Sequence, residues 1–113
     1  MKTFRMMAAG VLGLFMSLPL TALAEEGDPI LGREKAYTCM GCHAIDGYRN
    51  AYPAFRVPRI GGQHAQYIVS SLQAYKNGDR RHPTMQAIAA TLTEQDKRDI
   101  AAYFEALGRS ETP

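Results

Sequence analysis

Hydrophobic positions with helical spacing recur in three parts of the chain. In residues 64–76, Ile68, Leu72 and Tyr75 are spaced four and three residues apart, as on one face of a helix. Gly78 follows closely and is the kind of residue at which helices end. The pattern predicts a helix from His64 to Lys76.

A second helical stripe lies near the C-terminus. It consists of Ile100, Tyr103, Phe104 and Leu107. Thr93-Glu94-Gln95-Asp96 precedes it and is similar to a capping box in which Asp replaces the usual Glu. We expect this last helix to open at the box and to end at Gly108.

The remaining pattern completes an all-α prediction. A first helix is expected from Pro29 to about Cys42, with Asp28 as its cap. Glycines and prolines interrupt residues 44–62, which predicts an ordered loop, and residues 80–91 predict a loop with a short helical turn. Since no segment alternates with period two, we expect three main helices joined by two long Pro/Gly-rich loops.

The first 24 residues differ from the rest. Lys2 and Arg5 precede an uncharged apolar run, and Ala22-Leu23-Ala24 carries small residues where export cleavage sites need them. This predicts a cleaved secretory signal peptide (1–24), a single domain (25–113) and a periplasmic location without a membrane span after cleavage. An uncleaved anchor stays open, because the uncharged run approaches the ~20 residues that span a bilayer.

Net charge and chain length limit the classes of protein to which this sequence can belong. The whole chain has a net charge of +2, but residues 25–113 carry 11 basic and 11 acidic residues. No basic cluster with interleaved aromatic residues remains, so nucleic-acid binding has no support. A domain of this size buries only about 60–65% of its unfolded surface, which predicts a core with a small stability margin.

The two cysteines occur together as Cys39-Met40-Gly41-Cys42-His43. This spacing is typical of covalent c-type haem attachment, in which two thiols bond to the haem and the imidazole binds its iron. On a helix the three side chains share one face, and we expect Gly41 to keep bulk away from the haem. The motif predicts one covalent haem c with its iron, which would also supply buried surface that the small core lacks.

Three other uses of the cysteines compete with haem attachment. A thioredoxin-like pair is expected beside a βαβ pattern, which is missing. A zinc site needs two more strong ligands, and the other histidines are His64 and His82. A disulfide leaves His43 without a role.

The candidates for the second axial ligand of the iron are methionines and histidines. Four methionines fall within residues 1–24, and Met40 lies inside the attachment motif. Met85 is therefore the predicted ligand, and it follows a proline-restricted segment that can present a side chain. His64 and His82 remain as rivals. A His43/Met85 pair fills both axial sites and favours electron exchange over substrate binding.

The sequence resembles class I cytochrome c, in particular the short bacterial monohaem type that is similar to one half of the periplasmic dihaem cytochromes. The segments that carry this resemblance are 39–43, 58–63, 75–80, Met85 with 87–92, and 92–104. The resemblance implies a cytochrome c fold in which the first and last helices cross, with Gly32 and Tyr103 as candidate contacts. It also implies that the Pro58 carbonyl accepts a hydrogen bond from His43.

Residues 44–57 depart from the resemblance, because they are longer and more aromatic than the family pattern leads us to expect. The arginines in and after this segment are candidates for the haem propionates or for a docking protein. They are Arg49, Arg56, Arg59, Arg80 and Arg81.

The sequence thus predicts an electron carrier of a respiratory chain that cycles between Fe(II) and Fe(III) and is not an enzyme. Expected partners are redox proteins, such as a quinol-oxidising complex and a terminal oxidase or reductase, met as a monomer in transient complexes. Two alternatives stay open: an electron-entry subunit of a larger dehydrogenase or oxidase, and a gas-binding haem protein with a labile sixth ligand.

Overall fold

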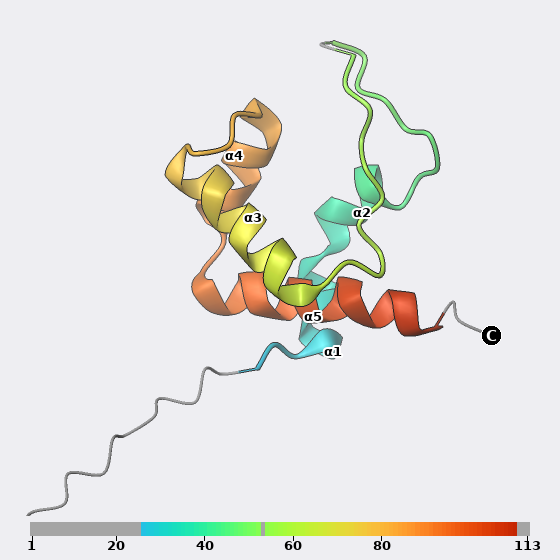
Figure 1. Cartoon of the computed structure of the whole chain (residues 1–113), viewed down its shortest axis with the longest axis vertical. Helices are drawn as coiled ribbons and strands as arrows, with labels where there is room; N and C mark the ends of the chain where they lie inside the picture. Colours follow the sequence, from blue (N-terminus) through green and yellow to red (C-terminus); the bar gives the residue numbers. More distant parts are fainter. Residues whose placement is uncertain (1–25, 53, 111–113) are drawn as a thin grey trace, which may run out of the picture.

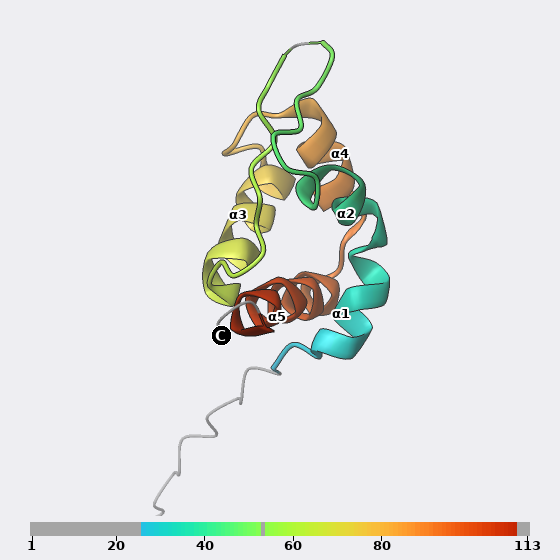
Figure 2. The same ribbon diagram turned by 90° about the vertical axis from the view of Figure 1, so that its right-hand side faces the viewer.

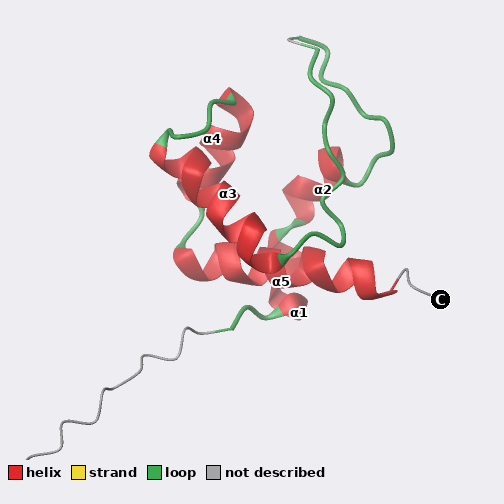
Figure 3. Cartoon of the chain, viewed as in Figure 1, coloured by secondary structure: helices red, strands yellow, loops and turns green. Residues whose placement is uncertain are grey.

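The computed structural model describes residues 26–52 and 54–110, and the predicted signal peptide lies outside them. The described chain forms helices and connecting loops (Figures 1 and 3). The helices are α1 (Pro29–Lys35), α2 (Tyr37–His43), α3 (Ala65–Asn77), α4 (Pro83–Thr91) and α5 (Glu94–Ser110). The all-α prediction is confirmed, but five helices replace the three main ones expected.

The predicted first helix is two helices that meet at Ala36. Asp28 caps α1 as expected, since its Oδ1 accepts from the backbone N–H groups of Ile30 (2.8 Å) and Leu31 (3.3 Å). At Ala36 the dihedrals φ −77° and ψ 1° leave the α-helical region. Ala36 is fully buried in the core, so tertiary packing turns the chain at a residue whose helix propensity alone would continue it.

Helix α4 corrects the expectation of a mere helical turn after residue 80. It has nine residues and begins at Pro83. Proline breaks a helix in its interior but is favoured in its first turn, where no intrahelical N–H bond is lost. The alanine-rich sequence then continues the helix because alanine is the best helix former.

Helix α5 opens as predicted but does not end at Gly108. The Thr93 N–H donates to Asp96 Oδ2 (2.9 Å) and the Asp96 N–H donates to Thr93 Oγ1 (3.1 Å), which is the reciprocal capping box. Gly108 lies inside the helix against Gly62, where an added Cβ would be 2.4 Å from the Gly62 Cα. This glycine permits a close backbone approach and is not a stop signal.

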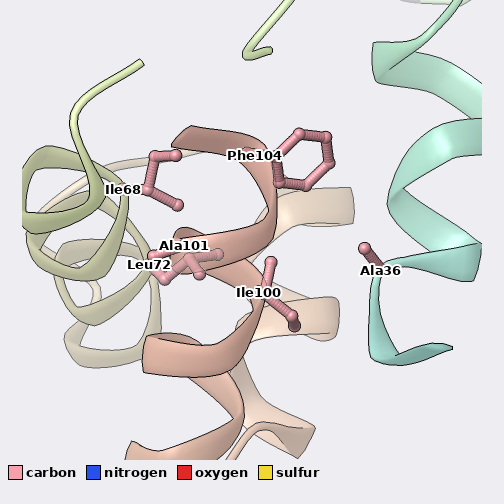
Figure 4. Packing of buried hydrophobic residues seen from close by; sticks show 6 residues of the cluster. All are labelled: Ala36, Ile68, Leu72, Ile100, Ala101 and Phe104. Carbon is pink, nitrogen blue, oxygen red and sulfur yellow. The ribbon is translucent and has the colours of Figure 1, made fainter. Parts of the chain in front are cut away.

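The core forms where α3 and the end of α1 pack against α5 (Figure 4). Its buried members are Ala36, Ile68, Leu72, Ile100, Ala101 and Phe104. Figure 2 shows α1 crossing α5 beneath the other helices. A Cβ on Gly32 would lie 1.9 Å from the Asp99 carbonyl oxygen and 2.9 Å from the Tyr103 Cβ, so the expected contact between Gly32 and Tyr103 is confirmed.

A buried carboxylate reinforces this crossing. Asp99, whose side chain is 1% exposed, accepts hydrogen bonds from the Asp28 N–H (2.9 Å), Lys35 Nζ (2.6 Å) and Gln95 Nε2 (2.8 Å). Burial alone would raise the pKa of Asp99, but these donors outweigh it and hold the pKa below its ordinary value. The carboxylate therefore links the start of the described chain to its last helix.

The loop after α2 rises as a narrow hairpin, which we call the 48–57 hairpin (Figure 1). Arg49 and Arg56 form an isolated antiparallel bridge, the Asn50 N–H donates to the Phe55 carbonyl (2.9 Å), and the Val57 N–H donates to the Tyr48 carbonyl (2.9 Å). The described residues contain no strand, and no helix among them combines the length and hydrophobicity that a membrane span requires.

Candidate haem site

A cavity of about 430 Å³ lies between α2, the 48–57 hairpin, α3 and α4. This volume falls within the range of about 300–1,000 Å³ that is usual for cofactor sites. Much of its wall is apolar, including Val57, Ile60, Ile68, Leu72 and Ile88. An apolar wall with a few polar groups fits a flat, largely apolar ligand.

Helix α2 places the three residues of the attachment motif on this cavity. Cys39, Cys42 and His43 all line it, because positions three and four apart share one helix face. Both thiols are free and half-buried, and burial raises the pKa of the Cys39 thiol. Gly41 is exposed and is not a lining residue, so the expectation that it spares bulk at the haem is not supported.

His43 is held in one orientation by the chain that follows the hairpin. Its Nδ1 donates to the carbonyl oxygen of Pro58 at 2.6 Å, the contact that the resemblance implied. A carbonyl can only accept, so the proton belongs on Nδ1 and the lone pair of Nε2 is left for another partner. Such a bond is the usual means of fixing a metal-binding imidazole.

Met85 comes to the same cavity from α4. It is the third residue of that helix, it is half-buried, and it also packs against the core. Met40 packs against the core without lining the cavity. Of the rival histidines, His82 lines the cavity, whereas His64 lies outside its lining with a side chain 90% exposed.

The residues present fit a covalently bound haem. Two thiols and an imidazole with a free Nε2 stand on α2, and a thioether on α4 lines the same apolar cavity. Thiolates, imidazole and thioether are the protein groups that attach and ligate c-type haem. Cys39 and Cys42 would hold the haem, and His43 and Met85 would ligate its iron.

The five arginines divide into two groups. Arg56, Arg59 and Arg80 line the cavity, whereas Arg49 and Arg81 do not. Arg59 pairs with Asp46 at 2.8 Å in an exposed ion pair, and the Arg80 guanidinium lies 4.6 Å from the centre of the Tyr75 ring. The arginines of the first group are therefore the better candidates to bind the haem propionates.

Two sets of lining residues escaped the sequence analysis. On α3, Tyr67 and Ser71 line the cavity together with Tyr75, which the predicted stripe had already included. A search for a second stripe on that helix would have found them. Phe55 of the hairpin lines the cavity as well. Its place there depends on how distant parts of the chain fold together, so no local sequence pattern could have predicted it.

Comparison with known proteins agrees with this geometry. The cytochrome c family model matches residues 31–108. The chain belongs to the cytochrome c family. It is 37% identical over 95 residues to cytochrome c4 of Pseudomonas aeruginosa, covering 83% of this chain and 46% of that protein. It is 40% identical over 81 residues to cytochrome c-554(548) of Halomonas halodenitrificans, covering 69% of this chain and 94% of that protein.

The chain is also similar to a further curated protein and to a solved structure. The "thiosulfate dehydrogenase electron acceptor" of Stutzerimonas stutzeri is 33% identical over 111 residues, covering 95% of this chain and 50% of that protein. The crystal structure of reduced recombinant cytochrome c4 from Pseudomonas stutzeri matches with a TM-score of 0.55 and 31% identity, covering 73% of this chain and 50% of that one. The chain thus spans about half the length of the cytochrome c4 proteins that it matches.

Proposed function

We propose that this protein is a monohaem c-type cytochrome that carries single electrons between redox proteins. One observation carries the proposal: Cys39, Cys42 and His43 on α2 line the same cavity as Met85 on α4. When bound, the haem supplies one-electron exchange between Fe(II) and Fe(III). The similarity to cytochrome c4 and to cytochrome c-554(548) supports this class of function.

The chain's residues then have separate tasks. Cys39 and Cys42 fix the haem covalently, and the Pro58 carbonyl keeps the proton on His43 Nδ1 so that Nε2 can bind iron. Met85 would supply a second ligand to the iron, which favours electron exchange over substrate binding. The apolar walls would limit the access of water to the iron, and the hydrophobicity of such surroundings helps to set its reduction potential.

We further propose export to the periplasm through cleavage of residues 1–24, leaving residues 25–113 as the cytochrome domain. The basic start, apolar run and Ala-x-Ala ending support this. Partners would be a quinol-oxidising complex and a terminal oxidase or reductase, met transiently. The relative named as electron acceptor of thiosulfate dehydrogenase favours a second role, acceptance of electrons from a dehydrogenase, free or as its subunit.

The test compares the two methionines outside the predicted signal peptide. The native protein should carry one covalent haem by mass and, when oxidised, show the weak near-infrared band of sulfur-to-iron ligation. Met85→Leu should abolish the band and let the reduced protein bind carbon monoxide rapidly. Met40→Leu, a change in a residue outside the cavity lining, should do neither. A native protein that lacks the band contradicts Met85 ligation, and rapid carbon monoxide binding by it would favour the gas-binding alternative.

A further inference from the structure

The 48–57 hairpin contacts α4 beside the predicted iron ligand. Figures 1 and 2 both show the hairpin extending to the end of the molecule where α4 lies. The Phe55 ring lies 5.2 Å from the His82 ring, centre to centre, at an interplanar angle of 46°. Tilted aromatic pairs at such separations are attractive beyond the area that they bury. The contact joins residues that the sequence analysis had left unrelated.

His82 is the residue from which α4 starts. It is the N-cap, with extended dihedrals of φ −160° and ψ 107°, and its Nδ1 accepts from the Met85 N–H at 3.4 Å. Its carbonyl accepts the first backbone bond of the helix, from the Gln86 N–H at 2.9 Å. N-caps hold the first helical turn in place, and Met85 lies in that turn.

We propose that Phe55 and His82 are positioning residues that hold Met85 in the cavity, with the hairpin acting through the His82 cap. Phe55 restrains the His82 ring, and the ring in turn restrains the backbone N–H of Met85. This inference rests on the proposed function, because it assumes that Met85 ligates the iron. It gives the long aromatic segment after the attachment motif a defined task.

The structure also limits which hairpin residues take part. Phe55 is 47% exposed, so its ring has both a solvent side and a side toward the cavity that it lines. Tyr52, near the tip, is 96% exposed and does not line the cavity. The two aromatic residues belong to one hairpin but differ in their contact with α4, which makes Tyr52 a matched control.

The experiment measures how fast added imidazole replaces Met85 on the oxidised iron, followed by loss of the near-infrared band in the holoprotein. Phe55→Leu should speed replacement about two- to tenfold, the scale of an aromatic pair contact. His82→Ala removes both the ring contact and the cap, so imidazole should replace Met85 faster in this variant than in Phe55→Leu. The reduction potential of His82→Ala should also be lower than that of the native protein. His82→Asn keeps a capping side chain and should restore part of the native rate. Tyr52→Ala should match the native protein.

Double substitution tests whether the two residues act as one unit. If the hairpin acts through His82, adding Phe55→Leu to His82→Ala should change the rate of Met85 replacement little. Covalent haem content and far-UV helicity equal to native show that the variants remain folded, and Phe55→Leu, at a half-exposed site, is the variant least prone to misfold. Native rates in both Phe55→Leu and His82→Ala overturn the inference. A native protein without the near-infrared band instead contradicts the proposed function, so the two failures are distinguishable.

Discussion

The crossing of α1 and α5 allows a quantitative test at Gly32. An alanine Cβ there would lie 1.9 Å from the Asp99 carbonyl oxygen, 2.5 Å from its carbonyl carbon and 2.9 Å from the Tyr103 Cβ. Side-chain carbons do not approach other atoms within 3.0 Å, so α1 must move away from α5 by at least about 1.1 Å. The obstacle is helix backbone, which cannot rotate aside as a side chain can.

The cost of that movement can be set against the gain in helix propensity. Overpacking of a close interface costs about 1–3 kcal/mol, and a backbone obstacle puts Gly32→Ala near the upper value. Replacing glycine by alanine within a helix contributes about 1 kcal/mol in the opposite direction. We therefore expect Gly32→Ala to lower the free energy of unfolding by about 2 kcal/mol, a large part of the ~4–13 kcal/mol typical of a domain of this length.

Urea unfolding of the holoprotein, followed by far-UV circular dichroism, measures this difference. Gly41→Ala is the matched control, because Gly41 also lies in a helix but an added Cβ there meets nothing within 4 Å. This control should be as stable as the native protein or up to about 1 kcal/mol more stable. If Gly32→Ala were also as stable as the native protein, the close backbone contact between α1 and α5 would be refuted.

Three other predictions concern pH, capping and the cofactor. Hydrogen bonds, first from Lys35 and then from Thr93, lower the pKa of Asp96 to about 2. The stabilisation that this carboxylate contributes is therefore present above about pH 4 and is lost as the pH falls toward 2. Unfolding in urea at pH 5 to 2 should show this loss of stability, and the loss should be smaller in Lys35→Gln. Thr93→Ala should cost about 1 kcal/mol in the same assay and Thr93→Ser much less, because serine keeps the oxygen that accepts from the Asp96 N–H. The haem-free chain should be largely unfolded, and a cooperative thermal transition with helicity near that of the holoprotein would contradict this.

Local chemistry explains which parts of the fold were predictable. Helix α3 and the start of α5 were predicted correctly because the signals, an apolar stripe and a capping box, lie within a few residues of each other. The division between α1 and α2 was missed because burial of Ala36 against distant residues decides it. Gly108 was wrongly predicted to end the helix, because its close contact with Gly62 depends on the tertiary fold.

The candidate site also combines features that follow from local sequence with features that depend on the tertiary fold. The grouping of Cys39, Cys42 and His43 follows from helical spacing alone, whereas Met85 was singled out by elimination and only the fold places it at the same cavity. The bond from His43 to Pro58 came from the family resemblance and not from any local pattern. Contact between Phe55 and His82 depends on a hairpin whose path no periodicity encodes.

The contact between α1 and α5 has a consequence for the order of folding. The bond from the Asp28 N–H to Asp99 joins residues 71 positions apart, and closing a loop of that length costs roughly 4 kcal/mol of chain entropy. Three of the six buried core residues, Ile100, Ala101 and Phe104, lie in α5. A chain whose synthesis has not passed residue 104 thus lacks half of its core and the partner of α1. The contact of α1 with α5 can form only after α5 has been made, so Cys39 and Cys42 are synthesised long before the helix that completes their surroundings.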